Sequence, residues 1–251
     1  MTPENSANDA ESTGVTDPID AQRAFWNQWN AMFVENQRGL TSQRQAAEVF
    51  RWLSEMGRAD LDILEVGCGS GWMASRLRSF GRVTAIDLAD DVLAVAQHKW
   101  PEIRFVSGDF MALEIPTASQ DVVVTLEVLA HVADQPAFFR KIAQTLRPGG
   151  LLMIAAQNRF VLERWENVAP RSHGQIRRWV NTAELCKLMS QELNVVEIFT
   201  VFPFAHGGIL RIVNSPKLNR LASMVVPQAT LDRWKEKRGL GHTIMGLARK
   251  S

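Results

Sequence analysis

The sequence predicts an α/β protein in which a mostly parallel β-sheet is covered by helices on both faces. Short apolar runs of strand length alternate with segments of helical spacing through the middle of the chain. These runs are almost continuously apolar, which is typical of strands buried on both faces. With 251 residues, of which 46% are hydrophobic, the chain is long enough for one such domain with added segments.

The N-terminal part divides into a tail and a helical segment. Residues 1–18 are rich in Ser, Thr, Asn, Pro and acids, which predicts a disordered acidic tail. Apolar and aromatic residues return over residues 19–58, where Ala46, Phe50 and Leu53 have helical spacing. We expect two helices here that form an N-terminal cap. The Trp and Phe cluster at 25–33 is interpreted as core or lid, with direct contact to an acceptor as the alternative.

Residues 59–251 are expected to form the main domain. One helix is indicated by Phe139, Ile142, Ala143 and Leu146, which share a face, and a turn over residues 147–150 should end it. Another helix should begin at Asn181, with Glu184 at the capping-box position. Strands are expected at residues 62–66, 82–86, 103–106, 122–126, 151–155, 195–202 and 242–248, with an insertion at about 203–241.

Composition excludes several classes of protein. The net charge is +1, which does not fit a protein that coats nucleic acid. The two cysteines make neither a disulfide framework nor a metal cluster, and no signal peptide or membrane-spanning run is present, so we expect a cytoplasmic protein. The basic residues after Arg211 could attract an anionic acceptor or touch a membrane surface peripherally; a solvated helical face is the simpler interpretation.

A glycine-rich turn, Gly67-Cys68-Gly69-Ser70-Gly71, follows the first predicted strand and precedes a helix. Glycine lets the backbone turn sharply and lets a ligand approach it closely. The helix N-terminus behind the turn offers N–H groups to an anionic group. Dinucleotide sites use a different spacing, G-x-G-x-x-G, and position 72 is Trp here. A nucleotide-like ligand is therefore expected, and the pyrophosphate interpretation is disfavoured.

Polar side chains follow the next strands at their carboxyl ends, where open α/β folds bind ligands. Asp87, followed by Leu88, could accept hydrogen bonds from ribose hydroxyls. Asp109 could bind an adenine amino group and Phe110 could pack on its face. The fourth strand ends at Leu126-Glu127.

Five segments of the chain resemble the successive motifs of class I S-adenosylmethionine-dependent methyltransferases: ILEVGCGSG, AIDLAD, SGDF, DVVVTLEVLAHV and LRPGGLLMIAAQN. Within this family, they are most similar to the small-molecule branch that includes the ubiquinone-biosynthesis O-methyltransferases. The resemblance covers about Leu61–Gln157. It implies a Rossmann-like, doubly wound sheet of seven strands with the last strand antiparallel. It also implies N-terminal helices and a C-terminal lid insertion that cover the acceptor pocket.

The resemblance implies S-adenosyl-L-methionine as cofactor and assigns residues to it. Gly67 and Gly69 would line the methionine part, with Cys68 and Gly71 in the same loop, and Glu65 would orient that loop. Arg38 or Arg44 could reach the methionine carboxylate. The remaining cofactor-binding residues would be Asp87 and Leu88 at the ribose, Asp109 and Phe110 at the adenine, and Leu126 from the fourth strand.

The acceptor is expected to be a small molecule methylated at a hydroxyl oxygen, and it could be anionic or lipid-like. His131 and Glu127 are the candidate catalytic residues, since a hydroxyl acceptor must lose its proton. A structural role for His131 without any part in catalysis is an equally open interpretation. The ubiquinone branch often carries Glu-x-x-Glu-His here in association with a metal, but Ala130 replaces the second carboxylate, so no metal is expected. The alternatives are a nicotinamide-dependent oxidoreductase and a non-catalytic cofactor-binding regulator.

Overall fold

The computed structural model describes residues 18–33, 39–165, 168–201 and 239–251. The predicted disordered tail up to residue 17 and nearly all of the predicted insertion at 203–241 lie outside these residues. Within them, no helix combines the length and the apolar character needed to cross a membrane.

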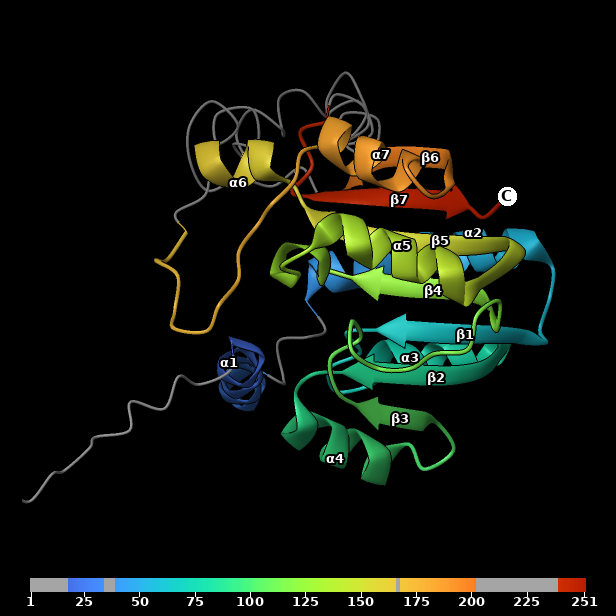
Figure 1. Ribbon diagram of the computed structural model, residues 1–251, viewed down its shortest axis with the longest axis horizontal. Helices are drawn as coiled ribbons and strands as arrows, with labels where there is room; N and C mark the ends of the chain where they lie inside the picture. The colour runs from blue at the N-terminus through green and yellow to red at the C-terminus, as the bar shows by residue number, and fades with distance from the viewer. Residues whose placement is uncertain (1–17, 34–38, 166–167, 202–238) are drawn as a thin grey trace, which may run out of the picture.

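The described residues form one seven-stranded sheet in the order β3-β2-β1-β4-β5-β7-β6 (Figure 1). Strand β7 is antiparallel to both of its neighbours, β5 and β6, and the other neighbouring pairs are parallel. The predicted fold class is thus confirmed. The strands are β1 (Leu61–Val66), β2 (Gly81–Asp87), β3 (Arg104–Ser107), β4 (Gln120–Leu126), β5 (Leu146–Gln157), β6 (Asn194–Val201) and β7 (Thr243–Arg249).

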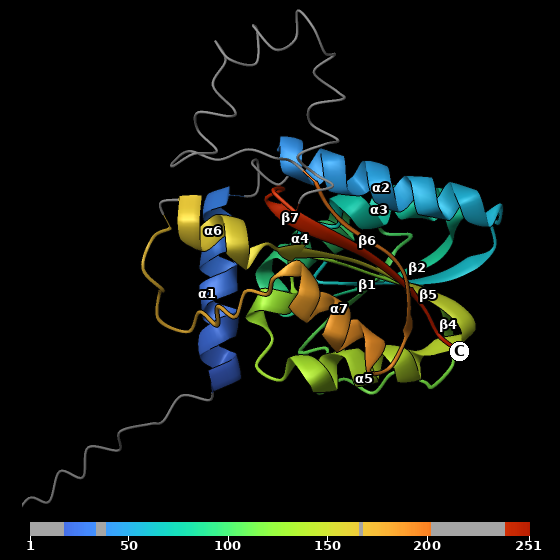
Figure 2. The ribbon, with the colours of Figure 1, turned by 90° about the horizontal axis from the view of Figure 1, so that it is seen from above.

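Helices cover both faces of the sheet, as Figure 2 shows with α2 and α3 on one side and α5 and α7 on the other. The helix α1 lies at the edge where the parallel strands end (Figure 1). The helices are α1 (Pro18–Phe33), α2 (Leu40–Met56), α3 (Trp72–Leu77), α4 (Asp90–Lys99), α5 (Gln135–Thr145), α6 (Arg159–Trp165) and α7 (Thr182–Ser190), with short 3-10 helices η2 (Arg78–Phe80) and η3 (Leu129–His131).

Each face of the sheet has its own hydrophobic core, because alternate residues of a strand point to opposite faces. Ile63 of β1 packs with Trp52 and Leu53 of α2 on one face, and all three are fully buried. Leu64, the next residue of β1, packs with Phe139 of α5 on the other face. The central strands are therefore apolar on both sides, and polar side chains concentrate at their ends.

Two local predictions can be checked against the backbone. Asn181 Oδ1 accepts a hydrogen bond from the Glu184 N–H at 2.9 Å and the Asn181 N–H donates to Glu184 Oε2 at 3.0 Å, which confirms the capping box. The helix predicted to include Leu146 ends at Thr145, because Leu146 already begins β5. The turn predicted over residues 147–150 takes a different form. It is a bulge inside β5, because Leu146 pairs with Gln120 while Leu151 already pairs with Val122.

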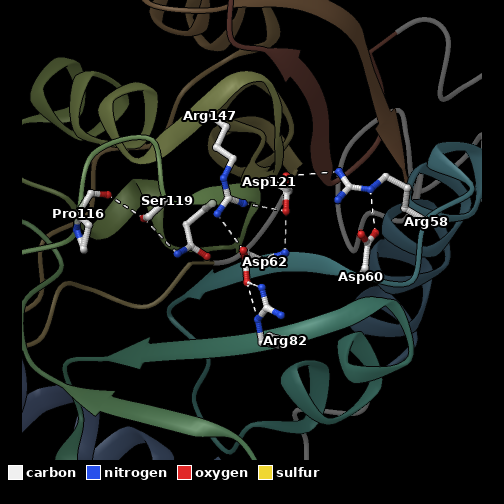
Figure 3. A network of polar contacts seen from close by, with 9 residues as sticks. Arg58, Asp60, Asp62, Arg82, Pro116, Ser119, Asp121 and Arg147 are labelled. Carbon is white, nitrogen blue, oxygen red and sulfur yellow. Dashed lines mark hydrogen bonds and ion pairs between the residues drawn. The ribbon is translucent and has the colours of Figure 1, made fainter.

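An ion-pair network joins the strands at the edge where β1 and β4 begin (Figure 3). Arg147 bridges Asp62 and Asp121 at 2.8 Å each, and Asp121 Oδ2 also accepts the Asp62 backbone N–H at 2.8 Å. Arg82 pairs with Asp62, and Arg58 pairs with Asp121. These contacts fix the register of β1, β2, β4 and β5 at one end of the sheet.

Candidate active site

A cavity of about 780 Å³ opens at the carboxyl ends of the parallel strands, under α1 and the beginning of α2. It is bordered by the loops after β1 to β4 and by the end of β5. The predicted site residues that line it are Glu65, Gly67, Cys68, Gly69, Asp87, Leu88, Asp109, Phe110, Leu126, Glu127 and His131. The fold thus brings together residues that are up to 66 positions apart in the sequence.

Gly67 begins the tight turn after β1. Its φ is +78°, and a Cβ at this position would lie 2.1 Å from Val128 Cγ2. The N–H groups of Gly67 and Cys68 both donate to the Ile86 carbonyl, at 2.8 and 3.1 Å. The turn is thereby anchored to the neighbouring strand β2, and a side chain at Gly67 would force both backbone strain and a clash.

Gly71 is the one predicted site residue outside the lining of the cavity. It precedes α3 with a φ of +72°, and a Cβ there would lie 2.7 Å from Phe105 Cζ. Its N–H donates to the Cys68 carbonyl at 3.0 Å, which closes the turn. Gly71 therefore shapes the loop from behind by packing against the Phe105 ring.

The carboxylate of Asp87 holds the glycine loop from the end of β2. Its Oδ2 accepts the Gly69 N–H at 2.7 Å and its Oδ1 accepts the Ala89 N–H at 2.9 Å. Burial raises the pKa of Asp87, while these backbone hydrogen bonds act in the opposite direction. The Leu88 backbone N–H contributes in the same way. An ionised carboxylate has about four lone-pair sites, so Asp87 keeps capacity for a ligand hydroxyl beyond these backbone bonds.

Glu65 is a buried carboxyl in the wall of the cavity. It is 3% exposed, and burial followed by repulsion from Asp87 raises its pKa to about 8. A hydrogen bond with the Ala74 backbone lowers the pKa in part, and this contact links β1 to the helix after the glycine loop. Within the described part of the chain, Oε2 has no hydrogen-bond partner. A ligand that carries a donor or positive charge would satisfy this oxygen.

Asp109 and Phe110 follow β3 and form the far wall. Asp109 Oδ1 accepts the Met111 N–H at 2.9 Å, which orders the loop, and Met111 also lines the cavity. Phe110 is 5% exposed and meets the Phe138 ring edge-on at 5.4 Å between centroids. The ring is therefore fixed by packing before any ligand arrives.

Glu127 directly follows β4 in a left-handed conformation, with a φ of +64°. Its Oε1 accepts hydrogen bonds from Gln45 Nε2 of α2 at 2.5 Å and from Thr243 Oγ1 of β7 at 3.0 Å. Burial raises the pKa of Glu127 to about 7, although both hydrogen bonds lower it. The carboxyl can thus gain or lose a proton near neutral pH.

His131 ends η3 on the other side of the cavity. Its Nδ1 lies 2.7 Å from the Ile176 carbonyl oxygen, which can only accept, so Nδ1 carries the hydrogen. The neutral ring then has its lone pair on Nε2. Burial lowers the pKa of His131, which keeps the ring neutral at pH 7. The ring meets Trp26 of α1 edge-on at 4.5 Å between centroids, and Gln22 Nε2 donates to the His131 carbonyl.

Several lining residues receive no role from the sequence, although Gln157 lies within the motif string LRPGGLLMIAAQN. Gln45, Gln157 and Ile176 reach the site from α2, β5 and the segment before α7. The positions of Gln45 and Ile176 depend on how distant elements pack, so no local pattern could reveal them. Gln157 did carry a signal, since it is a polar residue at the carboxyl end of β5. Arg44, a candidate for a carboxylate partner, pairs with Glu48 inside α2. The other candidate, Arg38, lies outside the described residues.

Comparison with known proteins agrees with this geometry. Residues 64–154 match the family described as "Methyltransferase domain". This region is a methyltransferase domain. The family resemblance seen in the sequence is thereby confirmed, and the matched region contains the predicted site residues from Glu65 to His131.

Two curated relatives illustrate the similarity of the methyltransferase domain. A "probable S-adenosylmethionine-dependent methyltransferase" of Mycobacterium tuberculosis is 37% identical over 39% of this chain and 36% of its own length. A ubiquinone biosynthesis O-methyltransferase of Methylocella silvestris is 37% identical over 52% of this chain and 56% of its own length. The chain thus matches about a third of the length of the first relative and just over half of the length of the second.

Solved structures share the fold over most of the chain. The N-methyltransferase NodS of Bradyrhizobium japonicum, in complex with S-adenosyl-L-homocysteine, covers 92% of this chain and 99% of its own with a TM-score of 0.61 and 16% identity. A methyltransferase from Mesorhizobium loti covers 76% and 92% with a TM-score of 0.55 and 20% identity. At identities of 16% and 20%, the likeness concerns the fold alone, that is, the arrangement of the sheet and its helices.

Proposed function

We propose that the protein transfers a methyl group from S-adenosylmethionine to a hydroxyl oxygen of a small molecule, with His131 as general base. When bound, this cofactor supplies a methyl group on a positively charged sulfur. The observation that carries the proposal is the contact between His131 Nδ1 and the Ile176 carbonyl, in the cavity that also holds the glycine loop and Asp87.

The residues fit the cofactor at three points. The Asp87 carboxylate has spare acceptor capacity for ribose hydroxyls, and Asp109 with Phe110 offers an acid and an aromatic wall for the adenine. The orphaned Oε2 of Glu65 is suited to a cationic part of the ligand. Glu65 has a pKa of about 8 without ligand, and a positively charged ligand beside it would lower this pKa and favour the ionised carboxylate, because charge interactions strengthen where water is excluded.

His131 would remove the proton of the acceptor hydroxyl at Nε2 while Nδ1–H stays bonded to Ile176. Such an arrangement fixes both the tautomer and the orientation of the ring. The edge-on contact with Trp26 adds a second constraint. General bases positioned in this way typically contribute about 10²–10⁴-fold to the rate.

We propose that residues 19–58 act as a cap over this site and that the domain proper spans 59–251. The N-terminal helix supports this, since Gln22 and Trp26 contact His131 and Asn27 Nδ2 donates to Asp90 Oδ1 of α4 at 2.7 Å. The cap is therefore held on both sides of the cavity. The lid predicted at about 203–241 is retained as part of this proposal.

The decisive experiment is calorimetric titration of the protein with S-adenosylhomocysteine and with NADH, followed by an acceptor screen with radiolabelled S-adenosylmethionine. We expect binding of the homocysteine compound and incorporation of label into a hydroxyl-bearing small molecule. Binding of NADH alone would establish the oxidoreductase instead. Cofactor binding without transfer to any acceptor would indicate the non-catalytic regulator.

A further inference from the structure

A cluster of polar side chains lies at the end of the cavity formed by β5, β7 and α2. Gln157, the last residue of β5, pairs directly with Thr243, the first residue of β7, in an antiparallel register. Directly opposed residues of antiparallel strands point to the same face, with their Cβ atoms about 5 Å apart. Thr243 Oγ1 in turn donates to Glu127 Oε1 at 3.0 Å. Gln157 and Glu127 therefore flank one hydroxyl on the α2 side of the sheet.

One oxygen of this cluster lacks a hydrogen-bond donor, and a second is not used by the two donors that contact Glu127. Gln157 Oε1 is buried in the wall of the cavity, and no group in the described part of the chain donates a hydrogen bond to it. Glu127 receives the hydrogen bonds of Gln45 and Thr243 on Oε1, so neither of them occupies Oε2. A buried oxygen without a donor is unusual in a folded protein and commonly indicates that a ligand or water completes it.

We propose that Gln157 and Glu127 form a subsite that accepts hydrogen bonds from the methyl acceptor. The acceptor is then a neutral or cationic molecule that carries at least one O–H or N–H group in addition to the hydroxyl deprotonated by His131. This inference rests on the proposed methyltransferase function. It favours a neutral or cationic acceptor over the anionic one that the basic C-terminal residues suggested.

The chemistry of the two oxygens determines this class of acceptor. A carboxamide oxygen accepts hydrogen bonds and never donates them, and the carboxylate of Glu127 behaves in the same way above its pKa of about 7. A carboxylate or phosphate on the acceptor would place lone pairs against both oxygens and add charge repulsion at Glu127. An O–H or N–H group would supply the missing donors. Binding energy at this end would then orient the reactive hydroxyl toward His131 at the other side of the cavity.

The test uses four small aromatic probes at pH 8.5, where Glu127 is ionised, with the protein saturated by S-adenosylhomocysteine. Binding is followed by tryptophan fluorescence and calorimetry. The probes are phenol, benzene-1,2-diol, 2-aminophenol and benzoate. We expect the diol and the aminophenol to bind about tenfold more tightly than phenol, since one additional hydrogen bond to a charged or buried acceptor has roughly this effect. Benzoate should bind no better than phenol.

The variant Gln157→Met keeps the shape of the side chain but removes the oxygen. We expect it to reduce the preference for the diol over phenol to less than about twofold and to leave S-adenosylhomocysteine affinity within twofold. Because an unsatisfied oxygen is removed, the melting temperature of the ligand-free protein should stay the same or rise. Gln144→Met, at an exposed position of α5, is the matched control and should change none of these values.

Several results would overturn the subsite. Equal affinity for phenol and the diol in the wild type would do so, as would tighter binding of benzoate or no binding of any donor-bearing probe. A large loss of S-adenosylhomocysteine affinity in Gln157→Met would assign Gln157 to the cofactor, and a clear fall in melting temperature would assign it a structural role. Donor preference without any methyl transfer would instead contradict the proposed function and leave the subsite in place.

Discussion

The carboxylate of Asp87 accepts the backbone N–H of Gly69 at 2.7 Å, so the end of β2 holds the glycine loop that follows β1. A second bond, from the Ala89 N–H to Oδ1, fixes the same carboxylate from the other side. One acidic side chain thereby orders the loop and presents a charge to the cavity.

We expect Asp87→Asn to weaken binding of S-adenosylhomocysteine by about 10- to 100-fold, because hydrogen bonds to a charged group contribute about 1.5–3 kcal/mol. Titration calorimetry measures this directly. Asp91→Asn, an exposed acid in the first turn of α4, is the control and should bind normally. Equal affinities of the two variants would remove Asp87 from the cofactor site.

Gly67→Ala should destabilise the fold and impair cofactor binding, because the added Cβ meets Val128 Cγ2 at 2.1 Å in a left-handed conformation. The conformation alone costs about 1–2 kcal/mol. Gly57→Ala isolates that cost, since Gly57 has a φ of +63° with no atom within 4 Å of the added Cβ. In urea unfolding, Gly67→Ala should lose more stability than Gly57→Ala, and adding Val128→Ala should recover part of the difference. A loss no greater than that of Gly57→Ala would contradict the steric argument.

His131→Ala should lower kcat by about 10²–10⁴-fold and leave S-adenosylhomocysteine affinity within twofold. The proposed base needs a neutral ring, and burial lowers the pKa of His131. Activity should therefore persist below pH 6.5, the ordinary histidine value, and fall only as the pH drops through the lowered pKa. A pH profile of kcat/KM with an acid limb above this value, or normal turnover in the variant, would exclude His131 as the base.

Glu127→Gln should make stability less dependent on pH. The pKa of Glu127 is raised from 4.5 to about 7 in the folded protein, so the wild type loses stability as the pH rises from about 4.5 to 7. The loss should be on the order of 3 kcal/mol, because each tenfold change in a protonation equilibrium corresponds to about 1.4 kcal/mol. Urea unfolding at pH 5 and pH 8.5 should show a smaller fall in the variant. An unchanged difference would show that Glu127 ionises normally.

Asp121→Asn probes the ion-pair network at the opposite edge. Burial alone would raise the pKa of Asp121, but the Asp62 backbone N–H and the charges of Arg147 and Arg58 outweigh it and lower the pKa. This stabilisation is present above the unfolded pKa of about 3.9 and is lost as the pH falls through the folded pKa. The variant should be less stable by about 1–3 kcal/mol at pH 7 and nearly equal to wild type at pH 2. Equal stability at both pH values would contradict a stabilising role.

Much of the fold and of the cofactor side could be predicted because the signals are local. A buried parallel strand is an apolar run, and a helix that follows it needs only its own periodicity and caps, as the box at Asn181 and Glu184 shows. The carboxyl ends of parallel strands meet at one edge, so the order of strands already places Glu65, Asp87 and Asp109 together.

The proposed acceptor side depends on contacts between distant elements. Gln45 and Thr243 are 82 and 116 residues from Glu127, and their hydrogen bonds require that α2 and β7 dock on the sheet as they do. Trp26 meets His131 in the same way, across more than a hundred residues. The amino-acid order alone specified an α/β sheet with a glycine cradle and a row of strand-end acids, because each arises from neighbours along the chain. Packing between distant elements set the tautomer of His131 and the surroundings of Glu127, since these depend on atoms that no local pattern specifies.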